Sequence, residues 1–174
     1  MNINQIIVNT ACNYIGYCEI SGNKGFQNEK FEDLMKNVGW QKGQAWCAYF
    51  TELVWKEAYQ QYNAYMFPTL DKLFSAGAVA TFNNFKKVKE FEISEIPVPG
   101  SVVIWQKYKD GMPHWTGHAG IVTEVYKDVF KSVEGNTNDS GGREGIEVAE
   151  KLRDVDFRIL PNTLVLKGFI HPVS

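Results

Sequence analysis

The first half of the chain carries apolar residues at helical spacing. Apolar or small side chains recur at i, i+3, i+4 and i+7 from the start of the chain, behind Asn2 or Asn4 as an N-cap. The pattern returns after Asn28 and is followed by Gly39, which suits a left-handed C-cap. A later segment is interrupted at Gly77, where we expect a break. The predicted helices cover residues 3–18, 31–38, 45–60 and 70–85.

The spacing of apolar residues changes from a helical to a strand-like period after Lys86. Short runs rich in β-branched residues, separated by Gly, Pro, Asn and Asp, follow one another to the end of the chain, which is typical of antiparallel strands. The predicted strands cover residues 88–93, 102–105, 118–125, 129–133, 146–152 and 164–170. Helices first and strands second predict an α+β fold, with N-terminal helices packed on a mostly antiparallel sheet. No repeat or linker divides the sequence, so residues 1–174 are interpreted as one domain.

Composition and charge narrow the class of protein. The 174 residues are 44% hydrophobic and 22% charged, with a formal net charge of −2, which suits a globular domain and lacks the basic surplus of nucleic-acid binders. No apolar run approaches the roughly 18 residues of a membrane span. The N-terminus has no basic region followed by an apolar run and a cleavage site. We therefore expect no nucleic-acid partner, no membrane insertion, and synthesis in the cytoplasm without a signal peptide.

The cysteines suggest a nucleophile. Their number is odd, which excludes a complete set of intrachain disulfides. Cys47 lies at the start of a predicted helix, where unpaired backbone N–H groups and the helix dipole stabilise a thiolate. The alternative is an inert cysteine packed between Trp46 and Phe50. Packing alone explains Cys12 and Cys18, which lie on the flank and on the apolar stripe of the first predicted helix.

A cysteine nucleophile needs an imidazole that takes its proton and a third group that orients the ring. His118 opens a predicted strand next to a glycine, a position that holds a side chain on a rigid element at the edge of a sheet. The next strand ends in Glu134 and Asn136, and residues two apart face the same side of a strand. A hairpin turn at residues 127–128 would place both beside His118. Taken singly, these residues also fit a structural histidine and a polar hairpin end.

Together and in this order, these segments resemble a known family. The segments are AWCAYF at 45–50, PGSVVIW at 99–105, GHAGIV at 117–122 and EGN at 134–136. They are similar to the motifs of the CHAP family, the cysteine, histidine-dependent amidohydrolases and peptidases, and the related NlpC-type cell-wall peptidases share the layout. The similarity extends from residues 15–19, which resemble the end of the family's first helix, to residues 167–170, which resemble its last strand.

The resemblance implies a papain-like fold and hydrolysis of amide bonds in peptidoglycan. Position by position, it makes Cys47 the nucleophile and His118 the general base. It makes Glu134 the residue that orients and charges the imidazole, and Asn136 a further polar member of the site. It implies no cofactor, and because no acidic calcium loop precedes Cys47, it implies no metal.

Other residues near the nucleophile are candidates for substrate contact. The oxyanion of a tetrahedral intermediate needs hydrogen-bond donors, and the backbone N–H of Cys47 is well placed at the helix start. Many CHAP domains have Gly-Gln directly before the nucleophile, whereas this chain has Ala-Trp, which leaves the side-chain donor unassigned. Gln41 has the offset of the papain oxyanion glutamine, and Gln44 lies closer in the sequence. We expect substrate contacts from Gln41, Gln44, Trp46 and Trp115.

Three other interpretations stay open. His114 and His118 with Cys47 could give three ligands of a zinc centre, although His114 lies in a Gly/Pro loop rather than on a helix face. A catalytically inactive module that binds cell-wall glycan or a partner protein would have no need for all the polar site residues in this order. A papain-like deamidase or transglutaminase-like effector would apply the same chemistry to protein, and only substrate assays would separate it.

The expected substrate is the peptide part of peptidoglycan. The scissile bond either joins muramic acid to L-alanine or lies in the stem peptide or cross-bridge. Because the helices and strands of the catalytic unit use the whole chain, we expect targeting by the domain itself or by a partner. We expect a monomer that acts in the cell wall or periplasm, either after release as a phage lysin or after delivery as an effector. Its expected protein partners are an immunity protein or a delivery partner.

Overall fold

Helices precede strands in the part of the chain that the computed structural model describes, residues 1–137 and 145–174. The helices are α1 (Ile3–Cys12), α2 (Glu29–Asn37), α3 (Cys47–Tyr62), the short 3-10 helix η1 (Ala64–Met66), α4 (Phe67–Leu73) and α5 (Ala78–Phe85). The strands are β1 (Ile93–Ser94), β2 (Val102–Lys109), β3 (Met112–Val125), β4 (Val129–Thr137), β5 (Glu147–Asp154) and β6 (Leu164–Ile170). The predicted α+β class is confirmed.

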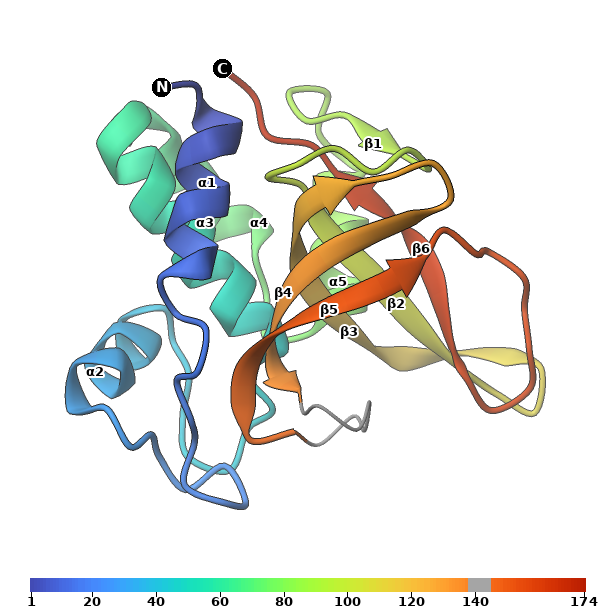
Figure 1. The fold of residues 1–174 in the computed structure, drawn as a ribbon, viewed down its shortest axis with the longest axis horizontal. Coiled ribbons are helices and arrows are strands. Elements are labelled where there is room, and N and C mark those ends of the chain that lie inside the picture. The colour runs from blue at the N-terminus through green and yellow to red at the C-terminus, as the bar shows by residue number, and fades with distance from the viewer. Residues whose placement is uncertain (138–144) are drawn as a thin grey trace.

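The strands form one antiparallel sheet in the order β1-β6-β2-β3-β4-β5. Strands β2 to β5 lie in chain order, and β6 returns to pair with β2. Figure 1 shows α1 and α3 along one side of the sheet, with α2 below them. Helix α3 contacts β3 and β4, and α5 contacts β2 and β3. The start of α3 therefore lies against the two strands that carry the predicted catalytic residues.

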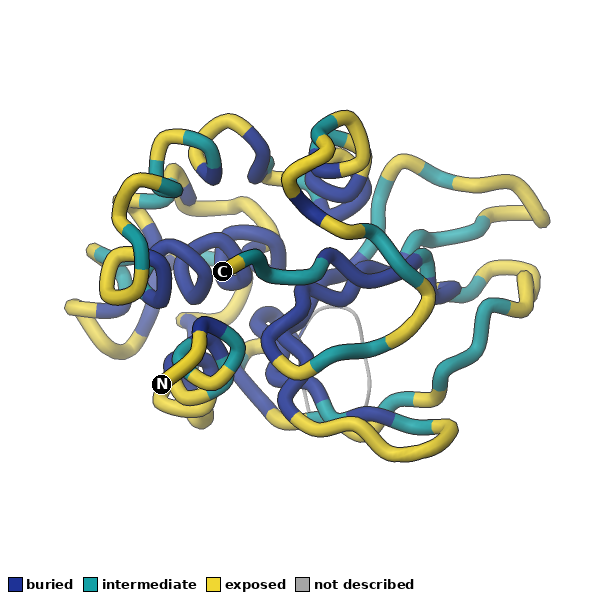
Figure 2. The backbone as a smooth tube through the Cα atoms, turned by 90° about the horizontal axis from the view of Figure 1, so that it is seen from above, coloured by how far each residue is buried: buried dark blue, intermediate teal, exposed yellow. Residues whose placement is uncertain are grey.

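The main core lies between the helices and the sheet. Helix α3 crosses this core, and Figure 2 shows buried backbone along it and along the central strands, while the long connections at the right are intermediate or exposed. Because successive strand residues face opposite sides, a second buried cluster forms on the other face of the sheet. This second cluster contains Val103, Trp105, Val122, Phe130, Leu166 and Phe169, with Val155 and Phe157 packed against it.

The first helix is shorter than predicted. It begins behind Asn2, whose side chain accepts a hydrogen bond from the backbone N–H of Gln5, but it ends at Cys12 rather than near residue 18. The chain then turns, and Gly16 adopts a φ of 88°, in the left-handed region that favours glycine. Cys18 lies beyond the helix, in an isolated β-bridge with Glu147. The placement of Cys18 on the apolar stripe of the first helix was wrong.

Other element boundaries differ in detail. The break expected at Gly77 within the segment 70–85 is confirmed, because α4 ends at Leu73 and α5 begins at Ala78, directly after Gly77. The expected strand at 88–93 is reduced to β1, and the strand expected from His118 begins at Met112. The predicted hairpin is present, with Val125 opposite Phe130.

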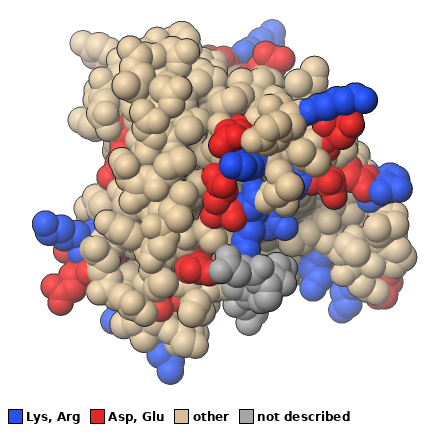
Figure 3. Space-filling view, viewed as in Figure 1, with Lys and Arg blue, Asp and Glu red and all other residues tan. Residues whose placement is uncertain are grey.

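Charge is unevenly distributed over the surface. Figure 3 shows acidic and basic side chains gathered over the front of the sheet, whereas the surface over α1 and α3 is largely uncharged. In the charged part, the Nζ of Lys131 lies 3.2 Å from a carboxylate oxygen of Glu124 and 3.2 Å from one of Glu150. Such exposed pairs contribute little to folding. Among the described helices, none has the length and apolar character needed to cross a bilayer.

Candidate active site

Cys47 is the first residue of α3 and is 8% exposed. The first backbone N–H groups of a helix have no partner within the helix, and the dipole is positive there. The ring of His118 and the backbone N–H groups of Ala119 and Ala48 stabilise the ionised sulfur of Cys47 by charge and hydrogen bonding. This environment suits a thiolate.

The ionisation of the cysteine and histidine is coupled. Burial by itself raises the pKa of the Cys47 thiol, but the charge of His118 and the hydrogen bonds to the sulfur outweigh burial and lower the pKa below its ordinary value. Burial also lowers the pKa of His118, which is 5% exposed, whereas Cys47 and then Glu134 raise it, and the net effect is a raised pKa. Both shifts favour a thiolate–imidazolium pair.

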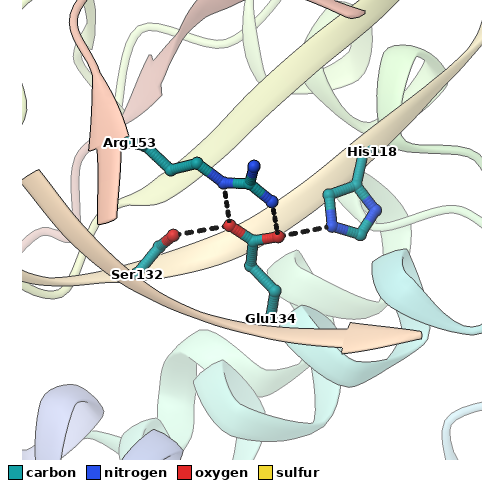
Figure 4. Close-up of polar contacts among 4 residues, drawn as sticks. All are labelled: His118, Ser132, Glu134 and Arg153. Carbon is teal, nitrogen blue, oxygen red and sulfur yellow. Dashed lines mark hydrogen bonds and ion pairs between the residues drawn. The ribbon is translucent and has the colours of Figure 1, made fainter. Parts of the chain in front are cut away.

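Glu134 completes a buried chain of polar contacts. Its side chain is 0% exposed, and its Oε2 lies 2.8 Å from Nε2 of His118 (Figure 4). An ionised carboxylate only accepts hydrogen bonds, so Nε2 carries a proton and Nδ1 is left for Cys47. Burial raises the pKa of Glu134, but hydrogen bonds from Arg153 and His118 lower it to about 2. Glu134 is therefore a carboxylate throughout the physiological pH range.

Two residues that the sequence analysis did not identify form hydrogen bonds with Glu134. The hydroxyl of Ser132 donates to Oε1 over 2.7 Å. Arg153 on β5 donates from Nε to Oε1 over 2.8 Å and from Nη2 to Oε2 over 2.6 Å, the two-pronged geometry shown in Figure 4. Ser132 lies two residues before Glu134 on β4, so strand alternation could have indicated it. Nothing in the sequence sets the register of β5, so Arg153 could not be found.

An aromatic ring packs against the histidine. Trp105 on β2 is directly opposite His118 on β3, and the ring centres lie 5.7 Å apart. The guanidinium carbon of Arg153 lies 5.4 Å from the Trp105 ring, close enough for a cation–π interaction. Trp105 therefore contacts both His118 and Arg153, the two residues on either side of the Glu134 carboxylate, and restricts where each can move.

Glycines allow the close approaches that the site requires. A Cβ atom on Gly120 would lie 2.7 Å from Cγ of Glu134, so a side chain there would displace the carboxylate. A Cβ atom on Gly135 would lie 2.5 Å from the Trp46 ring and 2.8 Å from Cβ of Phe50. The segments GHAGIV and EGN thus allow β3, β4 and the start of α3 to pack together.

Asn136 does not share the geometry of Glu134. It is buried and adopts a φ of 56°, and the pairing of β4 with β5 shifts register between Glu134 and Thr137. The alternation that was expected to place both residues beside the imidazole is therefore interrupted. The contact with Nε2 of His118 comes from Glu134. A catalytic contribution of Asn136 stays a prediction.

Trp46 does not line a substrate groove, which corrects the sequence prediction. Its side chain is 0% exposed, and its indole N–H donates to Oε2 of Glu19 over 2.6 Å. Its ring packs edge-on against Phe26, with 5.1 Å between ring centres. A tryptophan without solvent exposure cannot contact a ligand, so Trp46 supports the start of α3 from within the core.

The other predicted substrate contacts lie on the surface. The side-chain oxygen of Gln44 accepts hydrogen bonds from the backbone N–H of Gln41 and the hydroxyl of Tyr49, both over 3.0 Å. This amide therefore stabilises the loop before α3. Gln41 is exposed in the same loop. Trp115 is 78% exposed on β3, beside the ring of His114. Substrate contacts by these residues stay predictions.

The zinc interpretation gains no support from the arrangement of ligands. The Nδ1 atom of His114 lies 2.8 Å from the hydroxyl of Thr116. Within residues 1–137 and 145–174, no three His, Cys, Asp or Glu side chains are grouped so that they could hold a metal. All three cysteines are free: Cys12 is exposed, Cys18 is half-buried and Cys47 is buried.

Comparison with known proteins assigns the family. The family model of the CHAP domain matches residues 39–136, more than half of the chain, and this range contains Cys47, His118 and Glu134 but not Arg153. Neither the comparison with curated proteins nor the comparison with solved structures gave a match. CHAP domains are papain-like and are generally cysteine, histidine-dependent amidohydrolases. With this match and this α+β architecture, the chain belongs to the CHAP domain family.

Proposed function

We propose that this protein hydrolyses an amide bond in the peptide part of peptidoglycan, with Cys47 as the nucleophile. The observation that carries the proposal is the buried chain from Cys47 through His118 to Glu134, set at the start of a helix in a CHAP domain. A cysteine, an imidazole that exchanges its proton and a carboxylate that fixes the imidazole are the groups that amide hydrolysis through a thioester requires.

In the first half of the reaction, the Cys47 thiolate attacks the carbonyl carbon of the scissile amide. The oxygen gains a negative charge, and the backbone N–H of Cys47 at the start of α3 can donate a hydrogen bond to it. Nδ1–H of His118 gives its proton to the amide nitrogen. The carbon–nitrogen bond breaks, the amine leaves, and the acyl group remains on Cys47 as a thioester.

In the second half, neutral His118 removes a proton from water, and the resulting hydroxide attacks the thioester carbon. The carbon–sulfur bond breaks, the carboxylic acid product leaves, and the thiolate and imidazolium are restored. Glu134 contributes in both halves, since its 2.8 Å contact holds the proton on Nε2 and its charge stabilises the imidazolium. General acid–base catalysis of this kind contributes about 10²- to 10⁴-fold to rates.

Membership of the family supports peptidoglycan as the substrate and the cell wall as the place of action. Trp115 and Gln41 are exposed and are available for contact with a peptide or sugar. The bond between muramic acid and L-alanine, a bond of the stem peptide and a bond of the cross-bridge all fit the same chemistry. The choice among them depends on the loops around Cys47.

Mass spectrometry of digested peptidoglycan tests the proposal and identifies the bond. We expect the protein to release fragments with one new amino group and one new carboxyl group. The Cys47→Ala variant should release none, and Cys12→Ala, a matched change at an exposed cysteine, should release as many as the unchanged protein. Intact peptidoglycan after treatment with folded protein would contradict the proposal, as would equal digestion by Cys47→Ala. Release of ammonia from protein glutamine instead would identify a deamidase.

A further inference from the structure

Arg153 is a cation in direct contact with the polar chain of the site, and it lies outside the family motifs and the family match. It comes from β5, where it is opposite Phe130 of β4, and its side chain is 30% exposed. Two of its nitrogens bind the two oxygens of Glu134, at 2.8 and 2.6 Å. Figure 4 shows the guanidinium group on one side of the carboxylate and the imidazole of His118 on the other.

We propose that Arg153 is a positioning residue of this site: it orients the Glu134 carboxylate toward His118 and balances the charge of that carboxylate. The role rests on the proposed function, because it concerns the same cysteine and histidine. In this role Arg153 does not contact the substrate.

The first argument is geometric. A glutamate side chain has several rotatable bonds, and the last of them has only broad preferences. Arg153 binds both carboxylate oxygens at once, and Ser132 adds a hydrogen bond to Oε1. These three contacts fix the plane of the carboxylate, so that Oε2 lies 2.8 Å from Nε2 of His118. A lysine could provide the charge but not the two parallel hydrogen bonds.

The second argument concerns charge. Among residues 1–137 and 145–174, the charged groups around the imidazole of His118 are Cys47 from α3, Glu134 from β4 and, through Glu134, Arg153 from β5. β2 contributes the uncharged ring of Trp105. With the thiolate and imidazolium formed, the four charges sum to zero. Without Arg153 the buried group would carry a net negative charge, which would hold the proton on His118 more tightly.

The size of this effect follows from the shared oxygen. Nη2 of Arg153 and Nε2 of His118 both bind Oε2 of Glu134, at 2.6 and 2.8 Å, so the two nitrogens are roughly 5 Å apart at most. A unit charge at that distance shifts a pKa by about two units at an effective dielectric constant of ~20. Because Arg153 is partly exposed, solvent reduces the effect, and we expect a shift of about one pH unit.

The test is the pH dependence of Cys47 alkylation by iodoacetamide, followed by peptide mass spectrometry from about pH 5 to about pH 11. The upper inflection of this profile reports loss of the proton from His118. We expect Arg153→Met to move it upward by about one pH unit and Glu134→Gln to move it downward. Arg158→Met is the matched control: Arg158 pairs with Asp156 at 2.6 Å and is exposed, so its loss should leave the inflection in place.

Arg153→Lys separates charge from geometry. We expect its upper inflection to stay within a few tenths of a pH unit of the unchanged protein, while kcat/KM for peptidoglycan falls roughly 10-fold with little change in KM. If Arg153→Met does not fold, this lysine variant decides. Full activity in Arg153→Lys would contradict the geometric role. An inflection that stays or moves downward in folded Arg153→Met would contradict the charge role.

Failure of this proposal can be distinguished from failure of the proposed function. Alkylation requires no substrate, so the expected shifts in a protein that leaves peptidoglycan intact would support the role of Arg153 and contradict the proposed function. Peptidoglycan hydrolysis together with an unshifted inflection in Arg153→Met and full activity in Arg153→Lys would support the function and contradict the role of Arg153.

Discussion

Replacing Trp46 by phenylalanine distinguishes a core residue from a substrate contact. The substitution keeps an aromatic ring against Phe26 but removes the indole N–H that donates to Glu19 over 2.6 Å. Glu19 is buried, so its Oε2 loses a donor that water cannot easily replace. The smaller ring also leaves a void beside Gly135, where the tryptophan ring is closely packed.

These two effects set the expected loss of stability. A hydrogen bond to a charged group contributes about 1.5–3 kcal/mol, and the void left by the smaller ring costs roughly 1–2 kcal/mol. We expect the free energy of unfolding to fall by about 2.5–5 kcal/mol. For a chain of 174 residues this corresponds to a decrease in Tm of roughly 10 °C. Since Trp46 is fully buried, KM for peptidoglycan should stay within about twofold.

Thermal unfolding followed by circular dichroism, combined with steady-state kinetics below the transition, measures both quantities. Trp115→Phe is the matched control because the same change is made at a tryptophan that is 78% exposed. We expect it to leave Tm almost unchanged and to raise KM if Trp115 contacts the substrate. An unchanged Tm with a several-fold higher KM in Trp46→Phe would refute the assignment of Trp46 to the core.

Three further predictions concern the site. Glu134→Gln should lower kcat/KM by on the order of 10²-fold and move the alkaline limb of the pH–activity profile to lower pH, because the carboxylate raises the pKa of His118. Asn136→Ala should lower kcat/KM by about 10-fold, and a larger loss than that of Glu134→Gln would make the asparagine the orienting residue. Cys12→Ala and Cys18→Ala should keep activity, and a folded but inactive variant of either would be contrary to the assignment. Activity should persist in EDTA, since the described residues hold no metal-binding cluster; recovery on adding calcium or zinc would reveal a missed site.

The sequence predicted most helices and strands because the core selects apolar residues at the period of each element. It was less reliable where apolar residues fill the core without forming a helix. Tyr14 and Tyr17 continue the spacing of α1, but they lie beyond it and pack on Phe31 of α2, with ring centres 5.2 and 5.3 Å away. Periodicity alone could not separate these turn residues from a longer helix.

The site was predictable where its geometry is local. A tight turn between β3 and β4 brings Glu134 to His118, so strand alternation and turn position were sufficient. Arg153 reaches the same carboxylate from β5, which is separated from β4 by residues 138–146, too long a connection for turn chemistry to fix the pairing register of the two strands. The burial of Trp46 depends on Glu19 and Phe26, which lie in a segment without periodic pattern. Neither contact could be predicted from spacing.

Site-resolved alkylation of the unchanged protein tests most directly the claim that Cys47 is an ionised nucleophile. At about pH 6, iodoacetamide should modify Cys47 first, because its pKa is lowered, whereas burial and then Glu150 raise the pKa of Cys12. Peptidoglycan hydrolysis should fall in proportion to the modified fraction of Cys47, with Cys12 and Cys18 still unmodified. Loss of hydrolysis while Cys47 remains unmodified, or a Cys47 that reacts no faster than Cys12, would contradict the account.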